Sequence, residues 1–327
     1  MVENKILTYS SSPHVKTKRT TRFIMANVCI ALLPSCIAGC IFFGLYALLL
    51  LSLAVVSALL SEVVYKLLEK KNLNQIIKEF DFTSIVTGLL VGMTVGVNYP
   101  WYTVIFGSVF AIIVVKMLFG GTGCNLVNPA IAGRIFIFIS FQSVVTAWVL
   151  PNFASINQSA LTGATALDSL LKTGNTNLSL LDLFLGTGVA GCIGETCKLA
   201  LILGGIYLAV LGIINILYPI IYIVITGLFT VVLCDFNFAL FLPSILSGGL
   251  ILGAIFMATD YVTTPNTNLG NIIYFALLGL ITAGLRVATK MEVVSFAILL
   301  MNLFVPLIDK FVITRPFGFK KGKGGNK

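Results

Sequence analysis

Residues 161–169 form a short polar stretch that is well suited to carry a covalently attached group. The stretch reads Leu-Thr-Gly-Ala-Thr-Ala-Leu-Asp-Ser and lies in the longest polar interval of a very apolar chain. At its centre, Gly163 and Ala164 precede Thr165, so the threonine hydroxyl stands beside two residues with almost no side chain. A bulky group or a modifying enzyme could therefore reach this oxygen. An unmodified surface loop is the alternative interpretation, because small-small-Thr triplets are common.

A second polar stretch, residues 120–130, combines a glycine-rich approach with a helix start. It reads Gly-Gly-Thr-Gly-Cys-Asn-Leu-Val-Asn-Pro-Ala, and its polar side chains include those of Asn125 and Asn128. Asn128 followed by Pro129 predicts a capped helix N-terminus. Backbone amides in such an approach could face an anion or a ring system, although a plain turn with a cap is an equal alternative. Arg134 follows inside an apolar run, where a charge is costly unless it is paired or reaches the interface.

Two more polar stretches lie at residues 185–198 and 258–267. The first has too many glycines for an ordinary span, which predicts a half-helix or re-entrant segment covered by protein. Its Glu195 could bind a cation, orient a cofactor or pair with Lys198. In the second, Thr259 and Asp260 could cap helices or hold a polar ligand.

Several kinds of redox site are disfavoured by what the sequence lacks. The seven cysteines show no CxxC or ferredoxin-type spacing, so a self-contained iron–sulfur cluster is not expected. The single histidine, His14, argues against a histidine-ligated haem. No Walker motif and no GxGxxG after a strand is present. If the chain carries out redox chemistry, its electrons come from partner proteins.

The composition predicts that these stretches are positioned by a multi-span, all-α membrane protein. Of the 327 residues, 58% are hydrophobic and 10% charged, with a mean hydropathy of +1.03. Soluble domains carry about 25% charged residues. Apolar runs of about 20 residues without alternation match transmembrane helices rather than barrel strands. The polar, basic beginning of the chain predicts no cleavable signal peptide.

We expect about ten spans with both termini in the cytoplasm of a bacterial inner (plasma) membrane. The net charge of +9 concentrates before the first span and after the last, which favours contacts with anionic lipid over nucleic acid. In this topology, the Lys and Arg residues outside the cytoplasm are Lys172, Lys198, Arg286 and Lys290, and the Thr165 loop is extracytoplasmic. The predicted spans lie near 22–43, 45–67, 83–98, 100–119, 129–149, 199–217, 219–233, 237–257, 271–287 and 291–309.

An internal repeat suggests two halves of opposite orientation. Residues 84–92, Ser-Ile-Val-Thr-Gly-Leu-Leu-Val-Gly, resemble residues 244–253, Ser-Ile-Leu-Ser-Gly-Gly-Leu-Ile-Leu-Gly. Two halves of about five spans must be inverted, and such repeats place a site near their interface. Close packing of glycine-rich helices is the alternative. The predicted organisation is a tail (1–21), a first repeat (22–149), the attachment loop with a half-helix (150–198), a second repeat (199–310) and a basic tail (311–327).

Taken together, these motifs resemble the NqrB/RnfD family, and the similarity runs from about residue 10 to 312. The short N-terminal tail is closer to the RnfD branch, which belongs to the Rnf ferredoxin:NAD oxidoreductase complex. Four motifs carry the resemblance in the right order, Gly120-Gly121-Thr122-Gly123 with Asn128-Pro129-Ala130, Gly163-Ala164-Thr165, Ile193-Gly194-Glu195-Thr196 and Ala258-Thr259-Asp260.

The resemblance implies a flavoprotein subunit of a redox-driven Na⁺ or H⁺ pump. In this family FMN is attached through its phosphate to threonine in an Asp-x-x-Ser-Gly-Ala-Thr motif, which makes Thr165 the acceptor. Here Thr162 replaces the motif serine and Ser159 stands at the aspartate position. The resemblance also implies a fold like that of urea and ammonium channels. A second, non-covalent flavin, riboflavin or FMN, is expected near residues 120–134 and 258–267, and Glu195 and Asp260 are expected to couple redox change to ion movement.

The implied partners are a second covalent-FMN subunit, small iron–sulfur membrane subunits, peripheral subunits that handle ferredoxin and NAD, and a flavin transferase for maturation. Three alternatives remain open. The chain could be a secondary transporter or channel for a small polar solute without flavin, a purely structural membrane subunit, or a quinone-reducing NqrB-type subunit.

Overall fold

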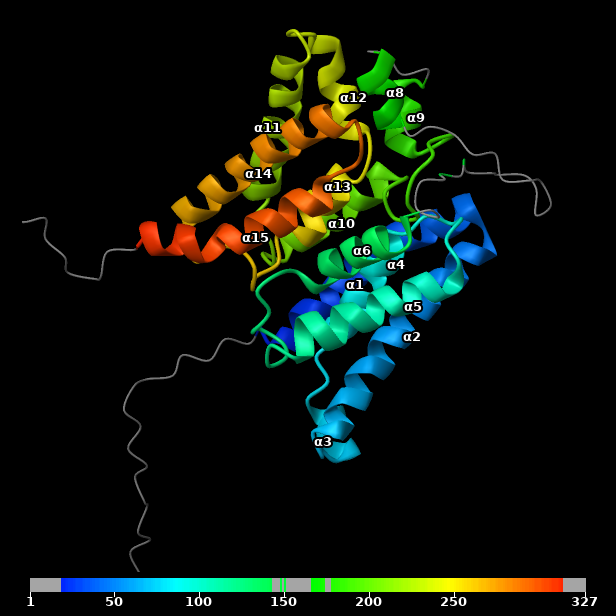
Figure 1. The fold of residues 1–327 in the computed structure, drawn as a ribbon, viewed down its shortest axis with the longest axis vertical. Helices are drawn as coiled ribbons and strands as arrows, with labels where there is room; N and C mark the ends of the chain where they lie inside the picture. The colour runs from blue at the N-terminus through cyan, green and yellow to red at the C-terminus, as the bar shows by residue number, and fades with distance from the viewer. Residues whose placement is uncertain (1–18, 143–147, 149, 151–165, 174–177, 314–327) are drawn as a thin grey trace, which may run out of the picture.

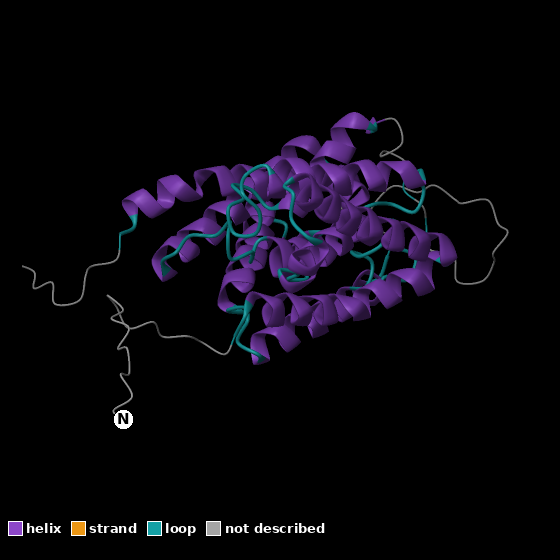
Figure 2. Cartoon of the chain, turned by 90° about the horizontal axis from the view of Figure 1, so that it is seen from below, coloured by secondary structure: helices purple, strands orange, loops and turns teal. Residues whose placement is uncertain are grey.

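The computed structural model describes residues 19–142, 148, 150, 166–173 and 178–313, and the described residues form helices and loops without strands (Figures 1 and 2). The first part of the chain contains α1 (Thr21–Phe43), α2 (Leu45–Leu68), α3 (Leu73–Lys78), α4 (Thr83–Met93), α5 (Trp101–Phe110) with the π-helix η1 (Ala111–Met117), and α6 (Pro129–Ser140). The second part contains α8 (Ala166–Thr173), α9 (Leu180–Leu185), α10 (Lys198–Val210), α11 (Leu217–Leu233), the 3₁₀-helix η2 (Phe238–Leu240), α12 (Phe241–Leu246), α13 (Leu250–Leu252) with the π-helix η3 (Gly253–Met257), α14 (Asn268–Thr289) and α15 (Val294–Phe311).

Within the described residues, four helices, α1, α2, α14 and α15, are long and apolar enough to cross a membrane. A fifth span is possible if the bent pair 238–246 and 250–257 is counted as one. Five further apolar helices, α4, α5 with η1, α6, α10 and α11, are shorter. The prediction of an all-helical membrane protein is confirmed, and the count of ten spans stays a prediction.

One predicted span differs clearly from the structure. The segment expected as a continuous helix over 237–257 is bent by 66° at residues 247–249. Gly248 lies there at a φ of +67°, a conformation that a helix cannot continue through and that glycine adopts without strain. The segment whose sequence resembles it, residues 84–92, lies in α4, which runs without a break from Thr83 to Met93.

The helices pack as two groups that meet along two contacts. In the first group α2 packs on α4 and α5, and in the second α14 packs on α11 and α15. Between the groups, α1 packs on α10 and α6 packs on α15. The first described helix begins and the last one ends on the same side of the bundle, at the left of Figure 1.

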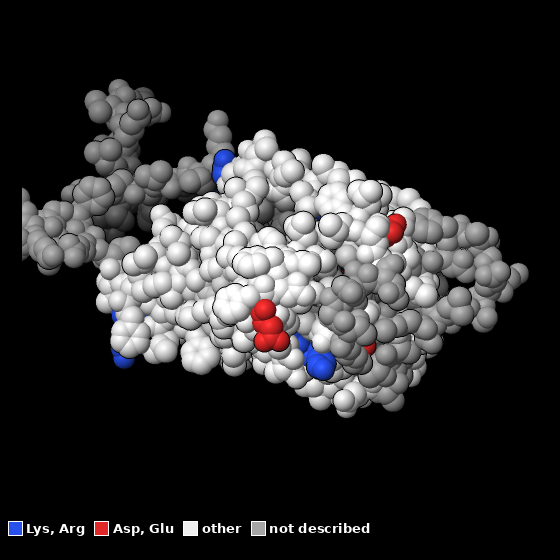
Figure 3. Space-filling model, turned by 90° about the horizontal axis from the view of Figure 1, so that it is seen from above, with Lys and Arg blue, Asp and Glu red and all other residues white. Residues whose placement is uncertain are grey.

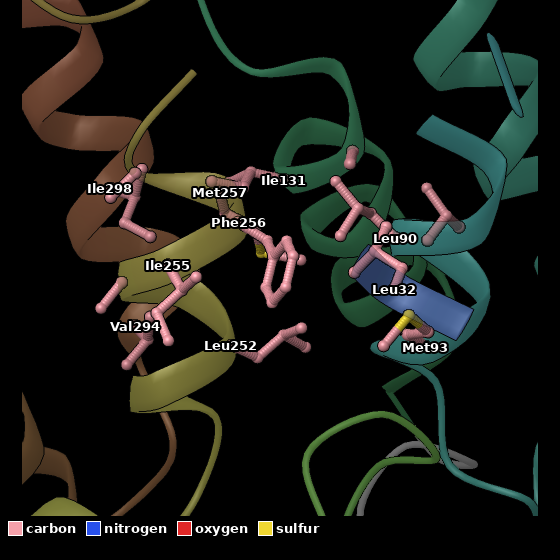
Figure 4. Packing of buried hydrophobic residues seen from close by; sticks show 14 of the residues in the cluster. Leu32, Leu90, Met93, Ile131, Leu252, Ile255, Phe256, Met257, Val294 and Ile298 are labelled. Carbon is pink, nitrogen blue, oxygen red and sulfur yellow. The ribbon is translucent and has the colours of Figure 1, made fainter. Parts of the chain in front are cut away.

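The core lies where the broken segment faces the first group of helices. Leu252 and Phe256 point from α13 and η3 toward Leu32 of α1 and Leu90 of α4 (Figure 4). The outer surface is different. Helix α11 exposes a stripe of apolar side chains, Leu217, Ile220, Val224 and Leu228. On the described part of the face in Figure 3, acidic and basic side chains are few and scattered, as expected for a surface in contact with lipid or other membrane subunits.

Candidate functional sites

The proposed acceptor Thr165, together with Ser159, Thr162, Gly163 and Ala164, lies outside the described residues. The next residue, Ala166, begins α8 and is only 5% exposed. It packs with Leu183 of α9 and with Val189, and Leu246 of α12 borders the same cluster. The chain is therefore held against α9 and α12 immediately after the acceptor position.

The motifs at 120–130 and 258–267 come together around one pocket, which we call the Asn128 pocket. Four of the residues predicted to hold a second flavin, Asn125, Asn128, Thr259 and Asp260, line it. Its other lining residues include Ile24, Met25, Val28, Thr83, Val86, Leu90, Lys116, Thr122, Leu208, Ile255, Phe256 and Tyr261. The lining combines apolar side chains with hydroxyls, amides, one lysine and one carboxylate. Arg134, which was predicted with this group, does not line the pocket.

Asn128 links the two motifs through hydrogen bonds. Its side-chain oxygen accepts a hydrogen bond from the Ala130 amide at 3.0 Å, which confirms the predicted cap of α6 with Pro129 in the first turn. Its Nδ2 donates to the Met257 carbonyl at 3.0 Å. Asn125 donates to the Val127 carbonyl at 3.0 Å and so shapes the approach to the cap. These bonds hold the side chains of Asn125 and Asn128 in place at the pocket.

Two unusual helical segments flank the Asn128 pocket. Lys116 comes from η1, and Ile255 and Phe256 come from η3. π-helical turns are rare and occur frequently at functional sites. Asp260 follows η3 directly, and its burial raises the pKa of its carboxyl group above the ordinary value although Thr263 donates a hydrogen bond to it at 3.4 Å.

A buried ionic group beside the pocket was not predicted from the sequence; we call it the Lys116 cluster. Glu62 on α2 pairs with Lys66 at 2.5 Å and with Lys116 at 3.1 Å. Lys116 also donates to the hydroxyls of Thr83 at 2.5 Å and Ser84 at 3.1 Å, and Ser84 donates to Glu62. The i, i+4 spacing of Glu62 and Lys66 within a predicted span indicates a buried ion pair and could have predicted part of this cluster.

Asp81 lies beside this cluster, at the entrance to α4. Burial raises the pKa of its carboxyl group, but hydrogen bonds from Thr83 and Thr122 and the charge of Lys116 outweigh that effect and lower it below the ordinary value. Thr83 and Thr122 donate to Asp81 at 2.5 and 2.8 Å. Both oxygens of the Asp81 carboxylate are thus hydrogen-bonded.

A second buried ionic group, the Glu195 cluster, lies at the other end of α4. It contains Arg134, Cys192, Glu195, Lys198, Arg286 and Glu292. The amide of Gly194 donates to the carbonyl of Met93, the last residue of α4. Helix α4 has 11 residues, so the two clusters are separated by about 15 Å along it.

The Glu195 cluster holds the break in the discontinuous span. Arg286 donates to the carbonyls of Ser244 at 3.1 Å and Ser247 at 3.4 Å, and it pairs with Glu292 at 2.9 Å. These carbonyls belong to the last turn of α12, where the helix supplies no partner. Arg286 therefore satisfies backbone groups that the break releases.

Glu195 itself is positioned by short-range bonds. Its Oε1 accepts a hydrogen bond from the Cys192 amide at 2.9 Å, while Lys198 donates to its backbone carbonyl rather than forming an ion pair with its carboxylate. Arg134 lies nearby, with one Nη atom 3.9 Å from the Cys192 sulfur. Glu195 and Arg134 belong to separate motifs in the sequence, and the structure places them in one cluster.

Among the described residues no group of three or more His, Cys, Asp and Glu side chains could hold a metal ion. The fold and these sites define a polytopic membrane protein with a polar-lined pocket near one end of its bundle and an ionic cluster near the other. The profile of the NQR2, RnfD, RnfE family matches residues 8–318, and the chain belongs to this family. The resemblance inferred from its motifs is confirmed.

Curated relatives resemble the chain along nearly its whole length. It is 42% identical over 321 residues to the D subunit of the Na⁺-translocating ferredoxin:NAD⁺ oxidoreductase complex of Acetobacterium woodii, covering 97% of each chain. It is 35% identical to the D subunit of the proton-translocating ferredoxin:NAD⁺ oxidoreductase complex of Clostridium ljungdahlii, covering 98% of each. It is 33% identical to the D subunit of the ion-translocating oxidoreductase complex of Escherichia coli, covering 96% of this chain and 99% of the relative.

Proposed function

We propose that this chain is the D subunit of an ion-translocating ferredoxin:NAD⁺ oxidoreductase complex and relays electrons in the membrane through bound flavin. The observation that carries the proposal is the 42% identity over 97% of both chains to the D subunit of a Na⁺-translocating ferredoxin:NAD⁺ oxidoreductase complex. The chain then works only in a complex, with the electron-carrying partners that its resemblance implies. Relatives include both a Na⁺- and a proton-translocating form, so the ion is one of these two.

We propose that Thr165 carries FMN through a phosphoester between its hydroxyl oxygen and the FMN phosphate. Gly163 and Ala164 give a flavin transferase access, and the anchoring of Ala166 on α9 and α12 supports a fixed attachment point. When bound, the flavin supplies the one- and two-electron chemistry. The covalent link prevents its loss between turnovers and keeps it near its neighbours. Ser159 in place of the motif aspartate is expected to affect recognition by the transferase, not the choice of acceptor.

A second, non-covalent flavin fits the chemistry of the Asn128 pocket. Its apolar lining residues suit a ring system, and Asn125, Asn128 and Thr259 offer groups for hydrogen bonds. Its one lysine, Lys116, is already paired with Glu62, and Asp260 faces the same space, which favours a flavin without a phosphate. The enclosed volume is about 100 Å³, below the roughly 300–1,000 Å³ of small-molecule sites, so binding requires the lining to move.

Tyr261 is the lining residue best placed to move. It also borders an adjoining pocket of about 710 Å³, and its hydroxyl donates to the Ile213 carbonyl between the two spaces. Tyr261→Ala should join the pockets and change the amount of flavin that acid precipitation releases from the purified complex. Unchanged release from Tyr261→Ala and from Thr259→Val would contradict this location.

We also propose the inverted-repeat topology with both termini cytoplasmic and Thr165 on the outer side. The α1–α10 and α6–α15 contacts join elements that would be equivalent in the two repeats. Lys116 contacts Ser84 as Arg286 contacts the carbonyl of Ser244, and these serines begin the two repeated sequences. Reporter fusions test this: phosphatase activity after residue 165 and cytoplasmic fluorescence after residue 327 are expected, and the reverse would contradict it.

The function is tested in membranes from cells that lack this chain. Its return should restore ferredoxin-dependent NAD⁺ reduction together with ion uptake into inverted vesicles. A chain that assembles with no electron-carrying partner and transports a polar solute alone would instead support the transporter alternative.

A further inference from the structure

One oxygen of the Glu195 carboxylate lacks a partner. Glu195 is only 5% exposed, yet its Oε2 accepts no hydrogen bond from any described residue. An unpaired carboxylate oxygen away from water is costly, and native proteins rarely leave one without a bound water, ion or proton. This oxygen is therefore the atom of the Glu195 cluster with free capacity to accept a partner.

Two glycines allow the Glu195 carboxylate to approach the backbone closely. A Cβ atom at Gly191 would lie 2.5 Å from Oε1, and one at Gly249 would lie 2.9 Å from Oε2. Gly249 belongs to the break between α12 and α13. The free oxygen thus faces the interruption of a membrane helix, where irregular backbone is tolerated when it is buried in protein or lines a polar cavity.

The charged groups around Glu195 come from several elements, and none of them pairs with Oε2. Arg134 of α6 flanks the same point, because its Nη1 is 3.8 Å from the Cβ position of Gly249. Lys198 of α10 binds the backbone carbonyl of Glu195, and Arg286 of α14 binds Glu292. The remaining titratable neighbours are the Cys192 thiol and the Tyr99 hydroxyl.

We propose that Glu195 Oε2 is a ligand for one small monovalent cation, Na⁺ or a proton, and that Arg134 is the competing partner. The inference rests on the proposed function and deepens it by assigning an ion site. The nearby positive charges weaken cation binding, which suits a site that must release its ion as well as take it up. Arg134 lies close enough to turn toward Oε2, so it competes with the ion for the same oxygen.

The test uses purified whole complex and follows its unfolding temperature against NaCl, with choline chloride at matched ionic strength. Wild type is expected to gain stability saturably with Na⁺, because a ligand stabilises the state that binds it. Glu195→Gln should lose this gain. Arg134→Gln should lower the half-saturating Na⁺ concentration about tenfold, equal to about 1.4 kcal/mol. Asp309→Asn, at a carboxylate that binds Asn266 far along α15, is the matched control and should behave as wild type.

A second variant protects the test against misfolding of Glu195→Gln. Gly249→Ala places a methyl group against Oε2 and should raise the half-saturating concentration. If Na⁺ has no effect but the unfolding temperature of wild type depends on pH in a way that Glu195→Gln abolishes, the cation is a proton. Identical Na⁺ and pH dependences in wild type, Glu195→Gln and Gly249→Ala overturn the inference. Flavin content is read in the same samples: wild type without flavin refutes the proposed function, whereas a normal flavin content beside identical dependences refutes the ion site alone.

Discussion

The two buried ionic clusters differ in how completely their members are satisfied. In the Lys116 cluster, Glu62 has two lysines and a serine as partners, and Lys116 has one carboxylate and two hydroxyls. In the Glu195 cluster, Oε2 of Glu195 and Nε of Arg286 have no partner among the described residues. Fully paired buried groups make the packing around them rigid, whereas incompletely paired groups can still bind a ligand or change partners. We therefore interpret the first cluster as structural and the second as functional.

The helices that carry the clusters show the same contrast. Helix α4 is continuous, and the related segment of α12 and α13 is broken and bent by 66°. Broken helices near the centre of transporters expose backbone groups that bind substrates and ions. Here Arg286 donates to the carbonyls released by the break, and Oε2 of Glu195 lies beside the break without a partner among the described residues.

The largest effect is expected from Glu62→Leu. This change leaves Lys66 and Lys116 buried without their counter-charge, which should cost about 3–5 kcal/mol and lower the yield of intact complex. Unfolding temperature in detergent measures the loss. The exposed Glu69, whose carboxylate is 3.7 Å from Lys71, provides the control, and Glu69→Leu should leave the unfolding temperature nearly unchanged because water screens the pair. Equal losses would contradict the structural interpretation of the cluster.

Removing the central cation of each cluster sharpens the comparison. Lys116→Met leaves Glu62 paired with Lys66, whereas Arg286→Met removes the ion pair of Glu292 and the donor to two carbonyls. We expect Arg286→Met to cost about 3 kcal/mol and Lys116→Met about 1–2 kcal/mol, measured by thermal unfolding. The reverse order would show that the break does not depend on Arg286.

A smaller effect is expected at the cap that joins the two pocket motifs. Asn128→Ala removes the cap of α6 and the bond to Met257, for a loss of about 1–2 kcal/mol. Asn237→Ala removes a comparable cap at an exposed 3₁₀ turn and should cost about half as much. Unfolding temperature again measures both, and a larger loss at Asn237 would argue against the pocket as an organised site.

The smallest effect concerns pH. Burial raises the pKa of Asp260, so folding favours its protonated form. Its contribution to stability is therefore complete below the pKa of the unfolded chain, 3.8, and is lost as the pH rises through the higher pKa of the folded protein. Asp81 has a lowered pKa and acts oppositely, with stability lost as pH falls through its folded value. Asp260→Asn should flatten the loss of stability with rising pH in the acid range. An unchanged pH profile would place Asp260 in contact with solvent.

The sequence predicted the regular elements well because they depend on local apolar length and capping. Segments 22–43 and 45–67 correspond closely to α1 and α2, and Asn128 caps α6 as expected. The motifs also supplied Asn125, Asn128, Thr259 and Asp260, which line the Asn128 pocket. These signals are short-range, so they can be recognised without knowledge of the tertiary fold.

What the sequence did not predict depends on distant contacts. The break at residues 247–249 is stabilised by Arg286, about 40 residues away, and no local rule links the two. The pairing of Lys116 with Glu62 was not predicted, because the sequence does not show which residue pairs with a charge inside an apolar run. Arg134 was assigned to the nearest motif along the chain, whereas it lies beside Cys192 and Glu195 of a different segment.

The central claim, a membrane redox subunit with FMN attached to Thr165, is tested most directly by flavin fluorescence of the denatured chain in a gel. Wild type, Thr165→Val and Thr162→Val would be produced together with a flavin transferase that is active on another substrate. A fluorescent band at the 35.1 kDa chain in wild type and Thr162→Val, absent in Thr165→Val, is the predicted result. No fluorescence in wild type, or fluorescence that persists in Thr165→Val, would contradict it.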